Sequence, residues 1–249
     1  MADPSSSYLT AYRSIDETLK APPPGCTLFV VHESTRVAEI VRAARSHGIT
    51  VETVHKAELR RLAGESARDC ALRVPRGHGG PAALLADIIA PAEVTDALIV
   101  ILDHVTDPHN FGAILRSADQ FRVDGVVIPD RRSADITPVV LQSSAGSATH
   151  VPLVRVKNLV SAIETLKSAS YWVYGADMAG VRADATDLAG RTVLVMGGEG
   201  PGLSRLVRDR SDALVRVPAK GHADSFNVSV ATGILLYEIR RQQNWFEGC

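Results

Sequence analysis

The stretch ALIVILDHVTDPHNFGAILRSAD, residues 97–119, decides the fold of this chain. It opens with an uninterrupted apolar run, Ala97–Leu102, of the kind found in strands that are buried on both faces. A polar loop follows, and then a helical pattern from about Phe111 to Phe121. A buried strand that leads into a helix is the repeating unit of a parallel sheet, so the sequence predicts an α/β fold.

The same alternation continues to the C-terminal end. Further strands are predicted at Gly125–Ile128, Val151–Val154, Tyr171–Tyr174, Thr192–Met196 and Ala213–Val217, and further helices at Leu159–Ser168 and Ser225–Gln242. We therefore predict a mostly parallel sheet with helices on both faces. Ligands of such sheets bind outside the carboxyl ends of the strands, and three unusual segments of this chain follow strands in that way.

The residues before this sheet predict a smaller α/β unit. Its strands are expected at Thr27–Val31, Ile49–Val54 and Cys70–Val74, and its helices at Ser14–Leu19, Thr35–Ser46 and Ala57–Ala63. The stretch Pro75–Pro91 contains RGHGGP and has the composition of a linker. The predicted division is a flexible arm (1–14), a small domain (15–80), a linker (81–94) and a large domain (95–249).

Composition excludes several classes of protein. No apolar run approaches the roughly 18 residues that a membrane-spanning helix needs, and the first residues lack the pattern of a signal peptide, so a cytoplasmic location is expected. The cysteines, Cys26, Cys70 and Cys249, form neither a disulfide framework nor a metal knuckle. Because HExxH spacing is absent as well, we predict no metal.

The net charge of −1 does not favour binding of nucleic acid by bulk electrostatics. Any phosphate contacts must therefore come from local patches. One candidate cluster is Arg60, Arg61, Arg68, Arg73 and Arg76. An ordinary solvated face is an equally good interpretation of these arginines.

The first unusual segment is the loop and helix start after Leu102. Asn110 is suited to cap this helix, and Arg116 lies six positions further on, where the helix can turn it toward the strand ends. The alternative is a capping asparagine and a surface arginine that pairs with Asp119.

The second segment, VMGGEGPGL (195–203), is rich in glycine, which permits close approach of the backbone to a ligand. A dinucleotide motif that starts at Gly198 would need glycine at position 203, which is Leu203, and no phosphate loop is present. The alternative is a turn with an exposed Glu199.

The third segment (215–231) passes from a strand through a loop to a helix start, where Ser225 and Asn227 could act in a ligand site or only as caps.

Together, DPHNFGAILRSAD (107–119), HVPLVRVKNL (150–159), VMGGEGPGL (195–203) and SFNVSVATGI (225–234) resemble the SpoU branch of the SPOUT RNA methyltransferases. The likeness covers nearly the whole chain and is strongest to bacterial enzymes that methylate a guanosine 2′-hydroxyl in 23S ribosomal RNA. It implies a C-terminal trefoil knot, a homodimer, an RNA substrate and S-adenosylmethionine as methyl donor. It also implies that the small domain is an RNA-binding domain like ribosomal protein L30e.

The resemblance assigns roles to particular residues. The cofactor would be held by Gly197, Val217 and Phe226, and catalysis would use Asn110, Arg116, Glu199, Ser225 and Asn227. The chain departs from the family pattern at Phe226, where leucine is usual, and at Ala219, where methionine is usual. In the small domain, residues 67–70 stand where the family has a His-Gln-Gly stretch.

Alternatives to a ribosomal RNA methyltransferase remain open. The same chemistry could act on transfer RNA, although simpler relatives of that kind often lack the small domain. The chain could also be an RNA-binding or ribosome-assembly factor without catalysis. A nucleotide-dependent oxidoreductase fits least, because the glycine pattern is wrong.

Overall fold

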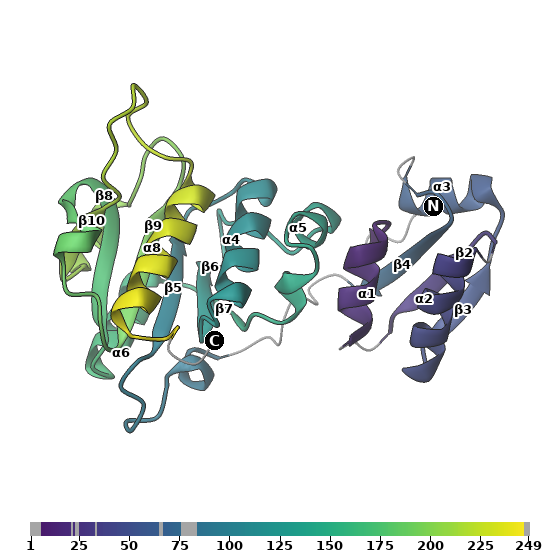
Figure 1. Cartoon of the computed structure of the whole chain (residues 1–249), viewed down its shortest axis with the longest axis horizontal. Helices are drawn as coiled ribbons and strands as arrows, with labels where there is room; N and C mark the ends of the chain where they lie inside the picture. Colours follow the sequence, from purple (N-terminus) through teal and green to yellow (C-terminus); the bar gives the residue numbers. More distant parts are fainter. Residues whose placement is uncertain are drawn as a thin grey trace.

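The computed structural model describes residues 6–20, 22, 25–32, 34–64, 67–75 and 84–246. Within these residues the chain forms two β-sheets with their own helices (Figure 1). Arg76, Cys249 and the first residues of the expected linker lie outside the described residues. None of the described helices is long and apolar enough to cross a bilayer.

The N-terminal sheet has four strands in the order β1-β4-β2-β3. Its strands are β1 (Ser6–Leu9), β2 (Thr27–Val30), β3 (Thr50–Thr53) and β4 (Cys70–Pro75), and its helices are α1 (Tyr12–Lys20), α2 (Thr35–Ser46) and α3 (Lys56–Ala63). Strands β2 and β3 are parallel, whereas β4 runs antiparallel to both β1 and β2.

The expectation of a flexible arm through Ser14 is wrong for residues 6–14. Strand β1 pairs with β4, where Leu9 lies opposite Leu72, and α1 begins at Tyr12. Leu9 is only 2% exposed and belongs to the core. The strand was missed because a four-residue segment with two serines shows no hydrophobic periodicity, and its pairing partner lies more than 60 residues away.

Both described cysteines are buried in this N-terminal unit. Burial raises the pKa of Cys26 to about 11 and that of Cys70 to about 12. Since the thiolate is the form that reacts, we predict that iodoacetamide at pH 8 leaves both residues unlabelled in the folded protein and labels both in urea, as read by peptide mass spectrometry. Rapid labelling of Cys70 without denaturant would contradict this packing.

The second sheet has six strands in the order β10-β8-β9-β5-β6-β7, and all five neighbouring pairs are parallel. The strands are β5 (Leu98–Asp103), β6 (Gly125–Pro129), β7 (Leu153–Val156), β8 (Trp172–Arg182), β9 (Thr192–Gly197) and β10 (Ala213–Arg216). Every residue of β5 and β6 is buried, as expected for central strands that are covered on both faces. The predicted parallel α/β sheet is thus confirmed.

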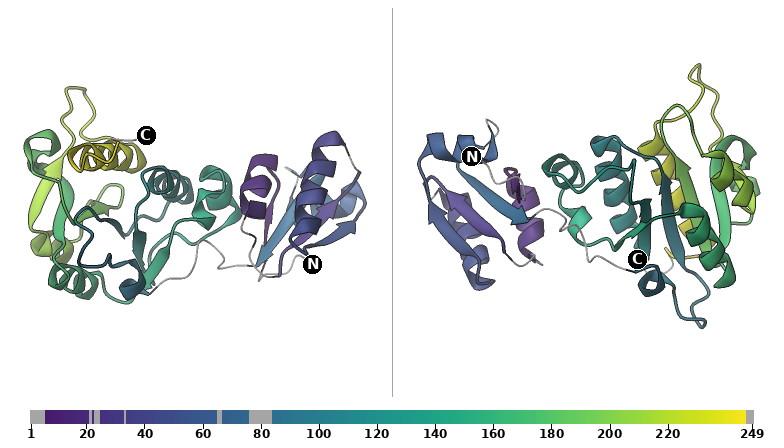
Figure 2. Two further views of the ribbon diagram at one scale, coloured as in Figure 1. Left: turned by 60° about the horizontal axis from the view of Figure 1, so that its bottom comes forward. Right: turned by 180° about the vertical axis from the view of Figure 1, so that it is seen from behind.

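Helices cover both faces of this sheet (Figures 1 and 2). One face carries α4 (Pro108–Gln120), α5 (Pro138–Ser143) and α8 (Val228–Gln242), and the other carries α6 (Leu159–Ser168) and α7 (Arg205–Arg210). Side chains along β5 point alternately to the two faces. Val100 packs in the hydrophobic cluster that includes α4, α5 and α8, and Ile101 packs in the cluster that includes α6 and α7. Short 3₁₀ turns lie at Leu85–Ile88, Ser147–Thr149 and Ala183–Ala185.

Some element boundaries differ from the sequence predictions. Helix α4 begins at Pro108, three residues before Phe111, and β8 continues to Arg182 instead of ending at Tyr174. The long β8 strand pairs with β10 twice, with an irregularity between the two pairings. Helices α5 and α7 were not predicted, since six residues are too few to display a helical period.

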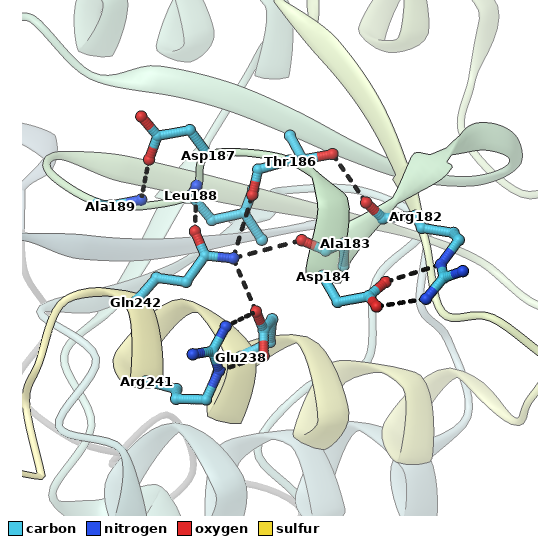
Figure 3. Close-up of polar contacts among 10 residues, drawn as sticks. All are labelled: Arg182, Ala183, Asp184, Thr186, Asp187, Leu188, Ala189, Glu238, Arg241 and Gln242. Carbon is cyan, nitrogen blue, oxygen red and sulfur yellow. Dashed lines mark hydrogen bonds and ion pairs between the residues drawn. The ribbon is translucent and has the colours of Figure 1, made fainter.

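The C-terminal end of α8 is fixed to the connection between β8 and β9 (Figure 3). The side-chain oxygen of Gln242 accepts a hydrogen bond from the Leu188 amide at 2.7 Å, and its nitrogen donates to the carbonyl of Thr186 at 3.1 Å. Glu238 accepts from Gln242 and from Arg241, and the Arg241 guanidinium lowers the pKa of Glu238. This anchoring holds α8 in a fixed position, and the start of α8 contributes to the site described next.

Candidate active site

Three polar side chains from distant parts of the chain meet beyond the carboxyl ends of β5 and β9. Asn110 comes from the first turn of α4, Glu199 from the loop after β9, and Asn227 from the residue that caps α8. The Asn110 amide nitrogen donates to Glu199 Oε1. The Asn227 amide nitrogen donates to Asn110 Oδ1 at 3.0 Å and to Glu199 Oε1 at 3.2 Å. Each side chain of this polar triangle therefore contacts the other two.

The helix cap fixes the orientation of Asn227. Its Oδ1 accepts hydrogen bonds from the Ser229 amide at 2.9 Å, the Ser229 hydroxyl at 2.6 Å and the Val230 amide at 3.4 Å. With the oxygen committed to the helix start, the amide nitrogen is the donor that faces Asn110 and Glu199. The predicted use of Asn227 as a cap is confirmed, and the cap also orients its amide nitrogen toward Asn110 and Glu199.

The prediction that Asn110 caps α4 is wrong. Asp107 is the cap: its carboxylate accepts from the His109 amide at 3.2 Å and the Asn110 amide at 3.3 Å. Pro108 occupies the first helical position, where its missing N–H costs nothing. The Asn110 side chain is thereby left for the polar triangle, where it is 8% exposed and hydrogen-bonded to both partners.

The glycines of segment 197–202 allow the loop that carries Glu199 to fold tightly. A Cβ atom on Gly197 would lie 2.2 Å from the carbonyl carbon of Gly202, and one on Gly198 would lie 2.5 Å from the oxygen of His104. Gly200 and Gly202 have φ angles of +84° and +66°, which favour glycine. The loop turns back on itself, and Glu199 is exposed.

A cavity of about 520 Å³ adjoins the polar triangle. Its lining includes six of the eight predicted site residues: Gly197, Glu199, Val217, Ser225, Phe226 and Asn227. Buried Met196, Val217 and Leu235 give it apolar walls, and Phe226, 40% exposed, stands at its surface. Ser225 lines the cavity but does not cap α8, because the helix starts at Val228 and Asn227 is its cap.

Arg116 lies apart from this arrangement. It is exposed in the middle of α4, and it does not line the cavity. Within the described part of the chain it makes no hydrogen bond or ion pair, so the alternative pairing with Asp119 is not formed either. The expectation that the helix turns Arg116 toward the strand ends is wrong for a single copy of the chain, because Ile114 and Leu115 occupy the inward face of α4.

The cavity lining carries charges of both signs, and its cation, Arg216, donates to the Gly180 carbonyl at 3.0 Å. Besides Glu199 the lining includes Asp177, which comes from β8 and pairs with Arg208 at 3.2 Å. In the part of the chain that the structure describes, Glu199 has only the neutral amides of Asn110 and Asn227 as hydrogen-bond partners. A carboxylate of this kind beside apolar walls suits a ligand with a cationic centre and an apolar body. Asp177 was missed because β8 was expected to end at Tyr174. Among the described residues no group of three His, Cys, Asp or Glu side chains is placed to hold a metal.

The arginine cluster of the small domain is partly engaged in local structure. Arg73 donates to the Thr27 hydroxyl at 2.7 Å and stacks on Phe29. Arg61 pairs with Glu58 at 3.7 Å on the surface of α3. Arg61 and Arg73 are therefore engaged in local contacts and are not free members of a basic patch.

Known proteins are similar to both parts of the chain. The sequence model of the SpoU rRNA Methylase family matches residues 97–237. A tRNA/rRNA methyltransferase of Mycolicibacterium smegmatis is 41% identical over 233 residues, which are 91% of this chain and 74% of that protein. A TrmH-family tRNA/rRNA methyltransferase of Staphylococcus haemolyticus is 39% identical over 84% of each chain.

A solved structure is similar to this chain over both sheets. The SpoU methyltransferase AviRb from Streptomyces viridochromogenes, in complex with the cofactor AdoMet, superimposes with a TM-score of 0.79 at 27% identity. The superposition covers 97% of this chain and 92% of AviRb, so it includes the N-terminal sheet as well as the six-stranded sheet.

Proposed function

Because this chain belongs to the SpoU rRNA methylase family, we propose that it transfers a methyl group from S-adenosylmethionine to a ribose 2′-hydroxyl of RNA. The substrate that we favour is a guanosine of 23S ribosomal RNA, as in the enzymes that the motifs resemble most. The observation that carries the proposal is the polar triangle of Asn110, Glu199 and Asn227 beside an apolar cavity with acidic groups.

The cavity suits S-adenosylmethionine in volume and in charge. Its apolar walls, with Val217 and Phe226, would hold the adenosyl part, and the backbone of Gly197 would contact it closely. The carboxylate of Glu199 would favour the sulfonium charge. When bound, S-adenosylmethionine supplies a methyl group that is already activated for transfer. Residue 226 would contact the cofactor through its backbone, and such a contact tolerates phenylalanine in place of the usual leucine.

In the proposed transfer the 2′-oxygen would gain the methyl group, its proton would pass to water, and neutral S-adenosylhomocysteine would be left. The side chains would hold the ribose in place for this exchange. The polar triangle offers amide and carboxylate groups that can orient the 2′-hydroxyl for attack. Ser225 would complete the site from the last loop. We assign Arg116 to the hydroxyl and its neighbouring phosphate. A guanidinium stays protonated in proteins and is a poor base, so this role is one of orientation.

A homodimer would explain the position of Arg116. Helix α8 exposes an apolar stripe of Val230 (49% exposed), Ile234 (40%) and Tyr237 (52%), which a second copy of the chain could cover. Since α4 and α8 pack side by side, Arg116 lies in the same helical layer as this stripe (Figure 1). We infer that Arg116 of one copy completes the site of the other.

Three further parts of the proposal concern architecture. The C-terminal domain, from about residue 95, is proposed to contain the trefoil knot of its family. The course of helix α8, which follows the edge strand β10 and returns to pack on α4, supports this part of the proposal. The N-terminal unit from residue 6 to about residue 80, which includes β1 and all of α1, is proposed to be an L30e-like domain that recruits RNA, joined through residues 81–94.

Gly197→Ala tests the cofactor site. The added methyl group would meet the backbone of Gly202 at 2.2 Å, so the loop must open. We predict at least a ten-fold loss of S-adenosylmethionine affinity by calorimetry, because a fraction of an ångström matters in such a site. Gly221→Ala is the matched control, since nothing lies within 4 Å of its Cβ position. Equal affinities of the two variants would contradict the assignment of the loop.

The RNA substrate is tested by mapping 2′-O-methylation. RNA from a strain that lacks this protein is compared with RNA from its parent by primer extension at low deoxynucleotide concentration. Loss of one stop in 23S ribosomal RNA is the expected result. Loss of a stop in transfer RNA would support the alternative substrate. No loss in either RNA, together with failure to bind S-adenosylmethionine, would favour a non-catalytic RNA-binding factor.

A further inference from the structure

A second cavity, of about 570 Å³, lies at the same edge of the sheet but outside the site described above. It is formed where β5 and β6 end and where α6 and α7 begin, with Asp103, Pro129, Leu159 and Val207 among its lining residues. Neither Asn110 nor Glu199 contributes to it. The proposed methyl transfer gives this cavity no role.

The position of the second cavity is one where parallel sheets commonly bind ligands. Strands β5 and β9 are neighbours, but the chain leaves β5 for α4 on one face and β9 for α7 on the other. Such a reversal opens a crevice at the carboxyl ends of the two strands. Asp103 at the end of β5 accepts a hydrogen bond from the Ser204 amide at 2.6 Å, so the crevice has a fixed floor.

The rim of the second cavity is basic. Arg131 and Arg132 follow β6, and Lys157 precedes α6. All three are exposed, and within residues 84–246 none of them makes a hydrogen bond or an ion pair. Most other arginines of this domain are paired. Examples are Arg155 with Asp135, Arg182 with Asp184, Arg205 with Asp209, Arg208 with Asp177, Arg210 with Glu164 and Arg241 with Glu238.

The acidic groups of the second cavity do not cancel this charge. Asp103 is fully buried, and its second oxygen lies 2.5 Å from Nδ1 of His104. Asp130 is the exposed acid among the lining residues, against the three cations. His104 has a φ angle of +61°, an uncommon conformation for a residue other than glycine, and its side chain is 41% exposed. The cavity thus presents a positive rim with an imidazole at its floor.

The turn that carries the two arginines is held by the backbone. The Ser133 hydroxyl donates to the Pro129 carbonyl at 2.6 Å, and the Ala134 amide donates to the Val105 carbonyl at 3.0 Å. The Asp130 amide donates to the Val156 carbonyl at 2.9 Å, which ties this turn to the segment before Lys157. The backbone that carries the rim is therefore fixed, which lowers the backbone entropy lost on binding an anion.

The two cavities share a wall. Gly202 lines the first cavity and Ser204 lines the second, so their Cα atoms lie within about 8 Å of each other. Gly198, in the same loop, packs against the His104 carbonyl. An RNA strand along this edge could place one ribose at the polar triangle and a neighbouring phosphate at the basic rim.

We propose that the second cavity binds a phosphodiester group of the RNA next to the nucleotide that is methylated. This inference rests on the proposed function, since it takes the substrate to be RNA. Phosphate contacts position a nucleic acid without reading its sequence, and arginine suits them well. The chain has a net charge of −1, so a local basic site of this kind is what RNA binding requires.

The test compares two triple variants with equal loss of charge. Arg131→Ala/Arg132→Ala/Lys157→Ala removes the rim, and Arg182→Ala/Arg205→Ala/Arg210→Ala removes three exposed arginines that are paired with acids. The probe is a fluorescein-labelled single-stranded RNA, measured by anisotropy over a range of salt concentrations. We expect the rim variant to lose at least about ten-fold in affinity and to show a salt slope shallower by up to about two. The control should stay close to the parent.

Calorimetry with S-adenosylmethionine separates this inference from the proposed function. The rim variant should bind S-adenosylmethionine like the parent, so loss of RNA binding alone supports the inference. Equal RNA affinities of the two triple variants, or no RNA binding by the parent, would overturn it. Competition assays with guanosine monophosphate and inorganic phosphate identify the source of the phosphate. Binding of either one at the rim while the RNA stays bound would assign the cavity to a free nucleotide or ion instead.

Discussion

Arg116→Ala should reduce methyl transfer about a thousand-fold and leave S-adenosylmethionine binding unchanged. The side chain is exposed on α4, outside the cofactor cavity, so its removal takes no contact from the donor. It is also unpaired within the described residues, so the fold should not suffer. The measurements are single-turnover transfer to RNA, calorimetric binding of S-adenosylmethionine and thermal unfolding.

Arg205→Ala is the control for this prediction. Arg205 is an exposed arginine of the same domain, 89% exposed in its side chain, and pairs with Asp209 at the surface. Its loss should change transfer little, because a surface ion pair contributes little. Full transfer activity in Arg116→Ala would remove this residue from the mechanism.

Asn227→Asp should reduce transfer about a hundred-fold while the helix cap survives. Aspartate caps helices as well as asparagine does, so the amides of Ser229 and Val230 keep their acceptor. The amide donor to Asn110 and Glu199 is lost, and a second carboxylate faces Glu199. Transfer rate and unfolding temperature are the two measurements.

Asn227→Ala and Asn158→Asp complete the comparison. The alanine variant loses the cap as well, and we expect about 1 kcal/mol less stability than in the aspartate variant. Asn158 caps α6 through the amides of Val160 and Ser161, so Asn158→Asp shows the effect of the same change on stability at another helix start. Transfer at the parental rate in Asn227→Asp would contradict a role for the polar triangle.

Co-expression of the Arg116→Ala chain with the Asn227→Asp chain tests the proposed site between two copies. In a mixed dimer, one site would combine the intact Arg116 of one copy with the intact Asn227 of the other. Random pairing should then restore about a quarter of parental activity. If Arg116 instead acted on its own copy, every site in the mixed dimer would lack one residue, and activity would stay lost.

The large domain could be predicted well because its pattern is local. Fully apolar strands such as Leu98–Asp103 and strong periodicity such as Leu159–Ser168 identify a covered parallel sheet without knowledge of the partners. By contrast, residues of β1 form a strand only because they pair with β4, and no pattern within β1 itself indicates this pairing.

The site could be predicted only in part. The glycines at 197–202 indicated a close backbone approach, and the cavity contains them. The triangle of Asn110, Glu199 and Asn227 joins residues up to 117 positions apart, and the family resemblance, not the pattern, brought them together. Asn110 was assigned as the cap because the sequence does not show that Asp107 and Pro108 begin the helix earlier.

Transfer of a radioactive methyl group, followed by digestion of the RNA to nucleosides, shows whether this protein methylates the ribose of RNA. The purified protein is incubated with methyl-labelled S-adenosylmethionine and ribosomal RNA from the deletion strain. We expect the label in a 2′-O-methylnucleoside, and no label when the protein carries Arg116→Ala. Label on a base instead of the ribose, or tight binding of S-adenosylmethionine without transfer to any RNA, would contradict this expectation.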